Sequence, residues 1–332
     1  MFFPLSTVSL FPHIFCSCAQ HWQIAAAQAG ADFFGYTIDG GQERGPPART
    51  HTLEIGLSKS FTHAGVTLRY TEGGASGGGT VLFLHGFGIS SYTWRHVAAA
   101  LAASSRVVCL DMKGFGASDK PDDGAYTAYD QAALAAAFME VGDMRGATVV
   151  GSSFGGHAAL ELFGLLAGTG RIGRLVLIGG AVPGQRLSFA ARLGMMLPPR
   201  PALAVIGPVV LKMLLRFVFY DVSRIAPEDL AEYGGSLRSP EARRVLLRAA
   251  PLIFAPGPNG PASERLGAID VPVLLIWGAN DRLIPVENAR RLAARIPGAR
   301  LVVLPECGHV PQEERPRETI DAIAAFLAQT PI

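Results

Sequence analysis

The sequence between residues 80 and 180 alternates short, wholly apolar runs with longer segments of helical character. The apolar runs are "TVLFLHG" (80–86), "RVVCLD" (106–111), "ATVVGS" (147–152) and "RLVLIGG" (174–180), and the pattern resumes at "VPVLLIWG" (271–278) and "ARLVVLP" (299–305). Strands joined by crossover helices pair in parallel, and strands covered by helices on both faces are apolar throughout. We therefore predict an α/β fold with a mostly parallel, doubly wound sheet.

Two segments depart from this alternation. Residues 1–58 show no sustained periodicity and end in the turn-rich "DGGQERGPPART", so we expect an irregular N-terminal extension. Residues 182–268 are helical and interrupted by prolines, which indicates an insertion between two parts of one core, 59–181 and 269–332. The glycine-rich run at 72–79 lacks the lysine of a phosphate-binding loop and is interpreted as a hairpin connection.

Composition and charge exclude several classes of protein. The 332 residues are 49% apolar and 17% charged, a globular balance that excludes disorder for most of the chain. The net charge is only +2 and no basic run is present, so we expect no nucleic-acid partner. The four cysteines form no CxxC pair and require no oxidising compartment. The oligomeric state cannot be deduced.

The N-terminal segment and one later run bear on localisation. "MFFPLSTVSLFPHIFCSCAQ" is apolar, but it lacks a basic n-region and is broken by Pro4 and Pro12, so we expect a cytoplasmic protein, with export as the alternative. The most apolar later run, 201–220, is interrupted by Lys212 and Arg216. We therefore expect no stable membrane span.

The segment "VVGSSFGGHAAL" contains Gly-x-Ser-x-Gly in one register, with Gly151, Ser153 and Gly155. The motif follows a buried strand and opens a helix, which is the setting of a nucleophile elbow. Glycines on either side let the strand and the helix approach each other around a strained serine. We predict that Ser153, not Ser152, is the nucleophile; the alternative is a helix N-cap among packing glycines.

A serine hydroxyl is a poor nucleophile until a base accepts its proton. Of the eight histidines, His309 is the one placed in a loop directly after the last apolar run. Asp281 follows another strand, between Ser153 and His309 in the chain, and is suited to orient the imidazole. The alternatives are a structural histidine and an aspartate in a surface turn.

Acyl transfer also requires two N–H groups for the oxyanion. One comes from the residue after the nucleophile, here Phe154, and the other from an earlier loop at a strand end. The "HGFG" segment offers the N–H of Phe87, with Gly86 and Gly88 allowing a close approach. We expect His85 to be a hydrogen-bonded scaffold residue.

Five motifs, "HGFG", "DMKGFGASDKP", "GSSFGG", "WGANDRLIP" and "CGHVPQEERP", occur in the order typical of the α/β-hydrolase superfamily. The chain resembles this superfamily over roughly residues 60–332. The resemblance implies the α/β-hydrolase fold, a triad of Ser153, Asp281 and His309, an oxyanion hole at Phe87 and Phe154, a structural Asp111 and a helical lid formed by residues 182–268. It implies neither a metal nor an organic cofactor.

These observations predict a serine hydrolase that cleaves small to medium apolar carboxylic esters through an acyl-enzyme. The same triad could serve a carbon–carbon bond hydrolase, a perhydrolase or an acyltransferase, and a lid arginine near Ser153 that binds a dienoate acid would favour the first of these. A third hypothesis is a non-catalytic ligand-binding protein that retains the triad, because fold alone does not decide function.

Overall fold

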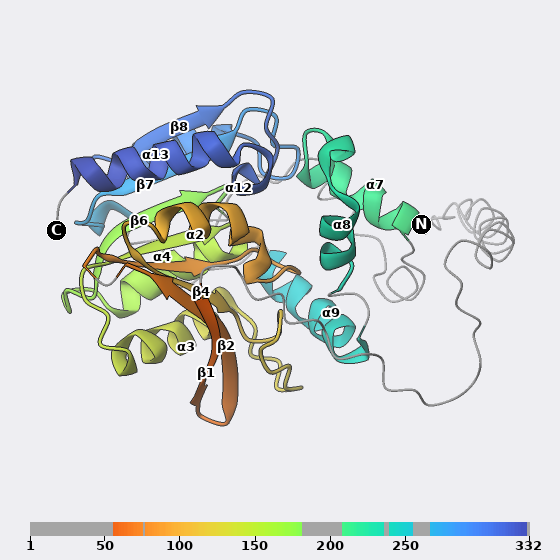
Figure 1. Cartoon of the computed structure of the whole chain (residues 1–332), viewed down its shortest axis with the longest axis horizontal. Coiled ribbons are helices and arrows are strands. Elements are labelled where there is room, and N and C mark those ends of the chain that lie inside the picture. The colour runs from red at the N-terminus through yellow and green to blue at the C-terminus, as the bar shows by residue number, and fades with distance from the viewer. Residues whose placement is uncertain (1–55, 76, 181–207, 236–238, 255–265, 331–332) are drawn as a thin grey trace, which may run out of the picture. The chain divides into compact units, whose positions relative to one another are not determined.

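The computed structural model describes residues 56–75, 77–180, 208–235, 239–254 and 266–330 (Figure 1). Nearly all of the predicted N-terminal extension lies outside these residues, as do parts of the predicted insertion. The domain boundaries at residues 182 and 268 therefore stay predictions.

Within the described residues, an eight-stranded sheet forms the centre of the fold. Its strands are β1 (Gly56–His63), β2 (Val66–Gly74), β3 (Thr80–Leu84), β4 (Arg106–Asp111), β5 (Ala147–Ser152), β6 (Ile172–Ile178), β7 (Val273–Gly278) and β8 (Arg300–Leu304). They lie in the order β1-β2-β4-β3-β5-β6-β7-β8. The pairs β1–β2 and β2–β4 are antiparallel, whereas every other neighbouring pair is parallel. The prediction of a mostly parallel α/β sheet is confirmed.

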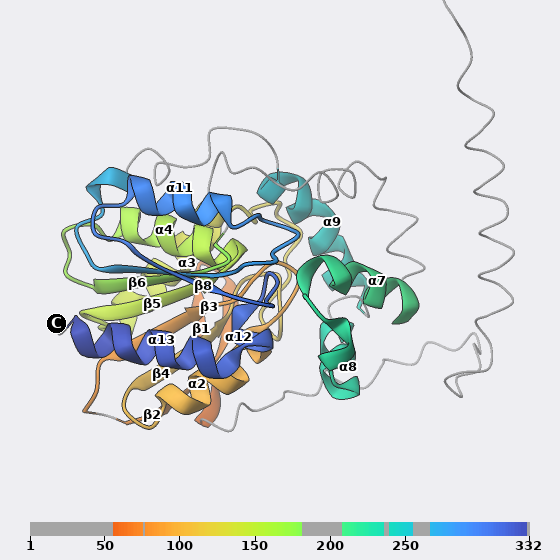
Figure 2. The same cartoon turned by 90° about the horizontal axis from the view of Figure 1, so that it is seen from above.

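Helices cover both faces of this sheet. They are η1 (Ser91–Trp94), α2 (Arg95–Leu101), α3 (Ala128–Val141), α4 (Phe154–Leu165), η4 (Leu266–Ala268), α11 (Glu287–Arg295), α12 (Pro311–Glu314) and α13 (Pro316–Gln329). Figure 2 shows α3, α4 and α11 on one side and α2 and α13 on the other. Alternate residues of β3 serve the two layers, since Leu82 and Leu84 pack in one apolar cluster and Val81 and Phe83 in the other. The fully apolar strands follow from this double cover.

Local signals explain where individual helices begin. Helix α3 starts with a capping box in which the Thr127 hydroxyl accepts the Asp130 N–H and the Asp130 carboxylate accepts the Thr127 N–H. Its interior is rich in alanine, the residue with the highest helix propensity, and Gly142 ends it.

The glycine-rich segment 72–79 is not the hairpin connection that we predicted. Strand β4 lies between β2 and β3, so this segment passes across the end of α2 to reach the far side of β4. Ala75 N–H donates to the carbonyls of Ala102 (3.0 Å) and Ser105 (3.1 Å). A Cβ on Gly74 would collide with the Ser105 carbonyl, so the glycines reflect a close passage of two backbones.

Strand β1 begins at Gly56, three residues inside the segment predicted to be irregular. It pairs with β2 from Gly56–Gly73 to His63–Val66 and forms the edge of the sheet. Most of its described side chains are exposed. An exposed edge strand carries no continuous apolar run, which is why the sequence pattern did not reveal it.

In the described parts of the chain between β6 and β7, three further helices occur: α7 (Pro208–Val218), α8 (Pro227–Tyr233) and α9 (Pro240–Phe254), with the short η2 (Val222–Arg224) after α7. We call α7, α8 and α9 the inserted helices. Leu215 and Phe219 form a small apolar cluster with Val310, which follows the last strand. Among the described helices, none combines the length and apolar character needed to cross a membrane.

The carboxyl end of β4 is fixed by buried hydrogen bonds. Asp111 accepts the N–H groups of Ser91 (2.7 Å) and Ala117 (2.8 Å). The Nε2 of His85 accepts the Met112 N–H (3.0 Å), and burial lowers the pKa of His85, which favours a neutral ring. Asp111 and His85 therefore hold the loops that follow the carboxyl ends of the strands.

Replacing Asp111 with Asn should lower the free energy of unfolding by about 1–3 kcal/mol, because one of the two backbone N–H groups would then face an amide NH2. Urea unfolding followed by circular dichroism measures this change. Asp143→Asn is the control: Asp143 is exposed and has φ 39°, a conformation that Asn tolerates. A loss at Asp111 no larger than at Asp143 would contradict the scaffold role.

Candidate active site

The turn between β5 and α4 has the backbone of a nucleophile elbow. Ser153 has φ 51° and ψ −117°, a sparsely populated conformation that costs about 1–3 kcal/mol in a residue with a Cβ. Its N–H donates to the Ile178 carbonyl (2.9 Å). A Cβ on Gly151 would collide with the backbone of Gly155, and a Cβ on Gly155 with the Leu84 carbonyl. The strand and the helix therefore approach as closely as the motif predicts.

The two serines of this turn lie in different environments. Ser152 is the last residue of β5 and is 1% exposed, and its Oγ accepts a hydrogen bond from Gln312 Nε2 (3.2 Å). Ser153 is half-buried at the turn itself. Of the two side chains, Ser153 is the one that solvent can reach.

An acid and a base meet at the carboxyl ends of β7 and β8. His309 Nδ1 lies 2.8 Å from Asp281 Oδ2, and both side chains are buried. The other carboxylate oxygen of Asp281 accepts the N–H groups of Leu283 (2.9 Å) and Ile284 (2.8 Å). Asp281 is therefore held as an acceptor, and Nδ1 of His309 is the proton-bearing nitrogen that it requires.

Backbone hydrogen bonds hold the two loops together. Ala279 N–H donates to the Leu304 carbonyl (2.8 Å), and Asn280 N–H donates to the Cys307 carbonyl (2.9 Å). These bonds extend the parallel pairing of β7 and β8 beyond the strands. The acid and the base thus keep a fixed separation although 28 positions separate them in the chain.

The imidazole also lies against the strand next to the elbow. A Cβ on Gly179 would lie 3.3 Å from His309 Nδ1 and 3.4 Å from Cε1, and Gly179 follows Ile178, the acceptor of the Ser153 N–H. Among the described residues, Nε2 of His309 is buried without a hydrogen-bond partner. The Ser153–His309 hydrogen bond is thus not formed in this structure; such contacts are commonly long until substrate binds.

The "HGFG" loop lies beside the elbow. A Cβ on Gly86 would lie 3.5 Å from Ser153 Cβ, so Gly86 brings this loop next to the serine. Phe154 is the first residue of α4, and its N–H therefore has no partner within the helix. The loop of Phe87 and the N-terminus of α4 therefore both lie beside Ser153, with the rings of Phe87 and Phe154 6.5 Å apart.

Aromatic side chains pack together beside the elbow. Phe87, Phe115 and Phe154 lie edge to face, with ring centroids 5.6 to 6.5 Å apart. Helix α9 lies close to the same loop, because a Cβ on Gly88 would lie 3.3 Å from Leu246 Cδ2. Phe115 was not identified from the sequence, although it lies within the "DMKGFGASDKP" motif.

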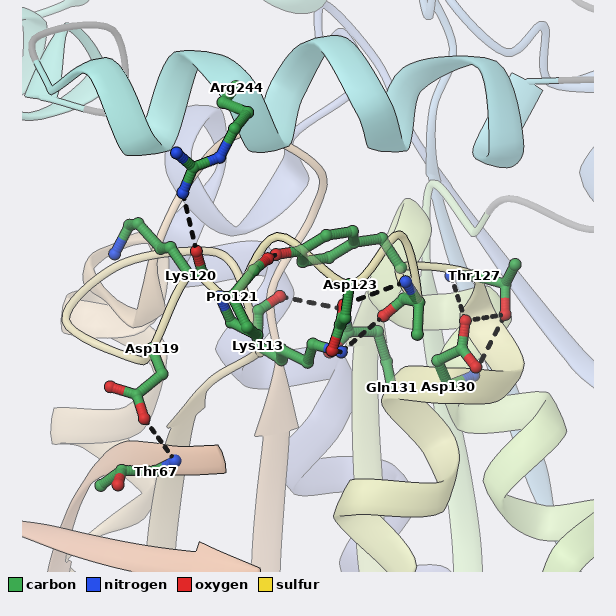
Figure 3. Close-up of polar contacts among 12 residues, drawn as sticks. Thr67, Lys113, Asp119, Lys120, Pro121, Asp123, Thr127, Asp130, Gln131 and Arg244 are labelled. Atoms are coloured by element: carbon green, nitrogen blue, oxygen red, sulfur yellow. Dashed lines mark hydrogen bonds and ion pairs between the residues drawn. The ribbon is translucent and has the colours of Figure 1, made fainter. Parts of the chain in front are cut away.

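The loop after β4 anchors helix α9. Figure 3 shows Arg244 of α9 extending to the Lys120 carbonyl (3.2 Å). Arg248, one turn further along the helix, pairs with Asp122 (2.9 Å). The loop is itself tied internally, since Lys113 Nζ donates to Asp123 (2.6 Å). These contacts of the loop after β4 therefore fix the position of α9 beside the "HGFG" loop.

One buried contact of the site could not be identified from the sequence. Gln312 is fully buried, and its Nε2 donates to Thr93 (3.0 Å) and Ser152 (3.2 Å). It connects the helix after His309 to the residue before Ser153. The "PQEERP" run lies within a predicted motif, but an amide in that run carries no sign of a partner 160 positions away.

Comparisons with known proteins agree with the observed fold. A sequence model described as "Alpha/beta hydrolase family" matches residues 81–322. A 2-hydroxy-6-oxononadienedioate/2-hydroxy-6-oxononatrienedioate hydrolase from Cupriavidus pinatubonensis is 30% identical over 265 residues, covering 76% of this chain and 88% of that hydrolase.

Two solved structures are also similar to this chain. The meta-cleavage product hydrolase from Pseudomonas fluorescens IP01 has a TM-score of 0.71 at 26% identity, covering 84% of this chain and all of that one. The esterase RhEst1 from Rhodococcus sp. has a TM-score of 0.69 at 25% identity, covering 82% and 99%.

Cys307 lies two residues before His309, and we expect it to be chemically inert. It is fully buried, and burial raises the pKa of its thiol far above the usual range, so no reactive thiolate forms near neutral pH. Iodoacetamide should modify Cys307 only after unfolding in urea, as measured by peptide mass spectrometry with and without denaturant. Modification in the folded protein would contradict the burial of this loop.

Proposed function

The chain belongs to the alpha/beta hydrolase family and is a serine hydrolase, and we propose from this premise that it cleaves small to medium apolar carboxylic esters. The observation that carries the proposal is the buried His309–Asp281 pair, whose imidazole packs against Gly179, the residue after the acceptor of the Ser153 N–H. This pairing suits proton removal from a serine hydroxyl.

The first step is attack by the Ser153 Oγ on the acyl carbon. His309 accepts the serine proton at Nε2, while Asp281 holds Nδ1–H and stabilises the imidazolium. Completing the Ser153–His309 hydrogen bond needs only a local adjustment, because the imidazole already lies against Gly179, beside the elbow. His309 then returns the proton to the departing alkoxide oxygen.

The oxyanion forms in the space between the "HGFG" loop and α4. The N–H groups of Phe87 and Phe154 donate to it there, and the N-terminus of α4 contributes a favourable dipole. Water then attacks the acyl-enzyme with His309 as general base, and the carboxylic acid leaves. No step requires a metal or an organic cofactor.

The aromatic and aliphatic surroundings support an apolar acyl group. The half-buried Phe87 supplies ring surface beside the elbow and is backed by the fully buried Phe115 and Phe154, and Leu246 of α9 adds an aliphatic side chain. We assign the inserted helices the role of a lid over this region. Apolar walls with a few placed polar groups are the usual composition of small-molecule sites.

Ser153→Ala should reduce turnover of p-nitrophenyl esters on the order of 10³-fold or more while the protein folds normally. Ser152→Ala is the matched control, since it removes the neighbouring hydroxyl but leaves the elbow hydroxyl in place. Fluorophosphonate labelling followed by peptide mass spectrometry should locate the label on Ser153. Label on Ser152, or loss of turnover in Ser152→Ala alone, would overturn the assignment.

A second candidate is hydrolysis of a carbon–carbon bond in an acidic dienoate, because several similar proteins are named as hydrolases of dienoates or of a meta-cleavage product. Such a substrate needs a cation near Ser153. Arg244 and Arg248 are already engaged with Lys120 and Asp122. Arg243 has no acidic partner among the described residues, and it precedes Leu246 by three positions, which places both on one face of α9.

A substrate panel separates the two candidates. Neutral p-nitrophenyl esters of increasing chain length and a 2-hydroxy-6-oxo-dienoate are compared in the wild type, in Arg243→Met and in the control Arg248→Met. Ester hydrolysis as the main activity predicts that neither variant changes ester kcat/KM by more than about threefold, less than 1 kcal/mol. A dienoate kcat/KM above that of every ester, lost in Arg243→Met alone, would establish the second candidate instead.

A further inference from the structure

Helix α12 begins two residues after His309, and three consecutive side chains of it reach separate parts of the fold. Gln312 reaches Ser152 and Thr93, as described above. Glu313 accepts a hydrogen bond from Arg95 (2.6 Å). Glu314 turns back toward the loop that carries the histidine. This short helix therefore connects His309 to its surroundings through side chains.

Glu314 joins the histidine loop to the inserted helices. Its Oε1 accepts the Gly308 N–H (2.7 Å), and its Oε2 accepts the Tyr220 N–H (2.6 Å), two residues beyond the end of α7. The N–H of His309 donates directly to the carbonyl of Val218, the last residue of α7 (2.6 Å). The chain after α7 is thus bonded both to the carboxylate and to the backbone of the histidine itself.

The chain segments around Gly308 pack closely. A Cβ on Gly308 would lie 2.7 Å from both Glu314 Oε1 and the Tyr220 nitrogen, closer than real Cβ contacts. Burial raises the pKa of Glu314, so holding a carboxylate here costs free energy that its backbone hydrogen bonds must offset. Such a cost is consistent with a specific positioning task.

We propose that Glu314 is a positioning residue that couples the end of α7 to His309, so that displacement of α7 displaces the base relative to Ser153. The inference rests on the proposed function, in which His309 is the base. It gives a role to the Nε2 of His309, which has no hydrogen-bond partner within the described part of the chain: when α7 moves as substrate enters, Glu314 and the Val218 carbonyl move the imidazole so that it completes its bond with Ser153.

Glu313 is the matched comparison for Glu314. It is a neighbouring buried carboxylate that also connects to an inserted helix, since its partner Arg95 pairs with Asp229 of α8 (2.9 Å). Among the described residues, however, no hydrogen bond joins Glu313 to Gly308 or His309. Removing its charge disturbs the contact with the inserted helices but not the histidine loop.

The test compares Glu314→Gln with Glu313→Gln in the full-length protein. We measure kcat and KM with a p-nitrophenyl ester, the thermal midpoint, and the far-downfield proton resonance of the His309–Asp281 hydrogen bond. Glu314→Gln should lower kcat on the order of 10²-fold with little change in KM, because the base is displaced, and should shift or broaden the resonance. Glu313→Gln should lower the thermal midpoint but retain the resonance, with kcat within about threefold of wild type.

Glu314→Asp provides a second test if Glu314→Gln does not fold. The shorter side chain keeps the charge but cannot reach both N–H groups, so we expect an intermediate kcat and a shifted resonance. An unchanged kcat and resonance in the Glu314 variant would overturn the proposal. So would parallel losses of kcat in the Glu313 and Glu314 variants that follow their thermal midpoints. Failure of the proposed function is recognised separately, by the absence of fluorophosphonate label on wild-type Ser153.

Discussion

The parallel alignment of strands β3, β5, β6, β7 and β8 is the constraint on which the candidate site depends. Parallel strands present their carboxyl ends at one edge, so residues far apart in the chain follow their strands to a common rim. Ser153 follows β5, Asp281 follows β7 and His309 follows β8. The parallel pairing of β7 with β8 continues into the two loops. It places Asp281 Oδ2 2.8 Å from His309 Nδ1.

The polar groups at this rim are held by the protein backbone more than by one another. Asp281 is fixed by the N–H groups of Leu283 and Ile284, and Ser153 by the Ile178 carbonyl. Backbone groups are rigid partners, so they can hold an acceptor or a strained turn in place without water. The one contact of the expected triad that is absent, between Ser153 and His309, joins side chains that follow β5 and β8, which are not neighbouring strands, whereas Asp281 and His309 follow the neighbouring β7 and β8. That is the point at which our proposal requires a small movement.

Much of the fold and the site could be predicted because each element carried a local signal. Continuous apolar runs marked the central strands, and Ser153, Asp281 and His309 each stand directly after such a run. The edge strand β1 and the path of residues 72–79 could not be predicted in this way. An exposed edge has no apolar run, and strand order depends on contacts between distant segments.

The polar residues that support the site were also beyond local reasoning. Gln312 bonds to Thr93, 219 positions away, and nothing near either residue indicates the other. Glu313 and Glu314 resemble the charged face of an exposed helix, and only the folded chain shows that both carboxylates point inward to different partners. Sequence reasoning thus identified the expected reacting groups but missed the side chains that connect them.

The left-handed backbone at Ser153 also separates two kinds of selection on this chain. A glycine there would adopt φ 51° without the penalty that a Cβ incurs, about 1–3 kcal/mol, but it would have no hydroxyl. Laboratory evolution for heat resistance alone would therefore favour the catalytically inactive glycine variant wherever this relief exceeds the larger backbone entropy that glycine loses on folding. Retaining the serine requires selection for catalytic activity as well. The backbone strain at Ser153 is the folding stability that the protein loses in exchange for a reactive hydroxyl.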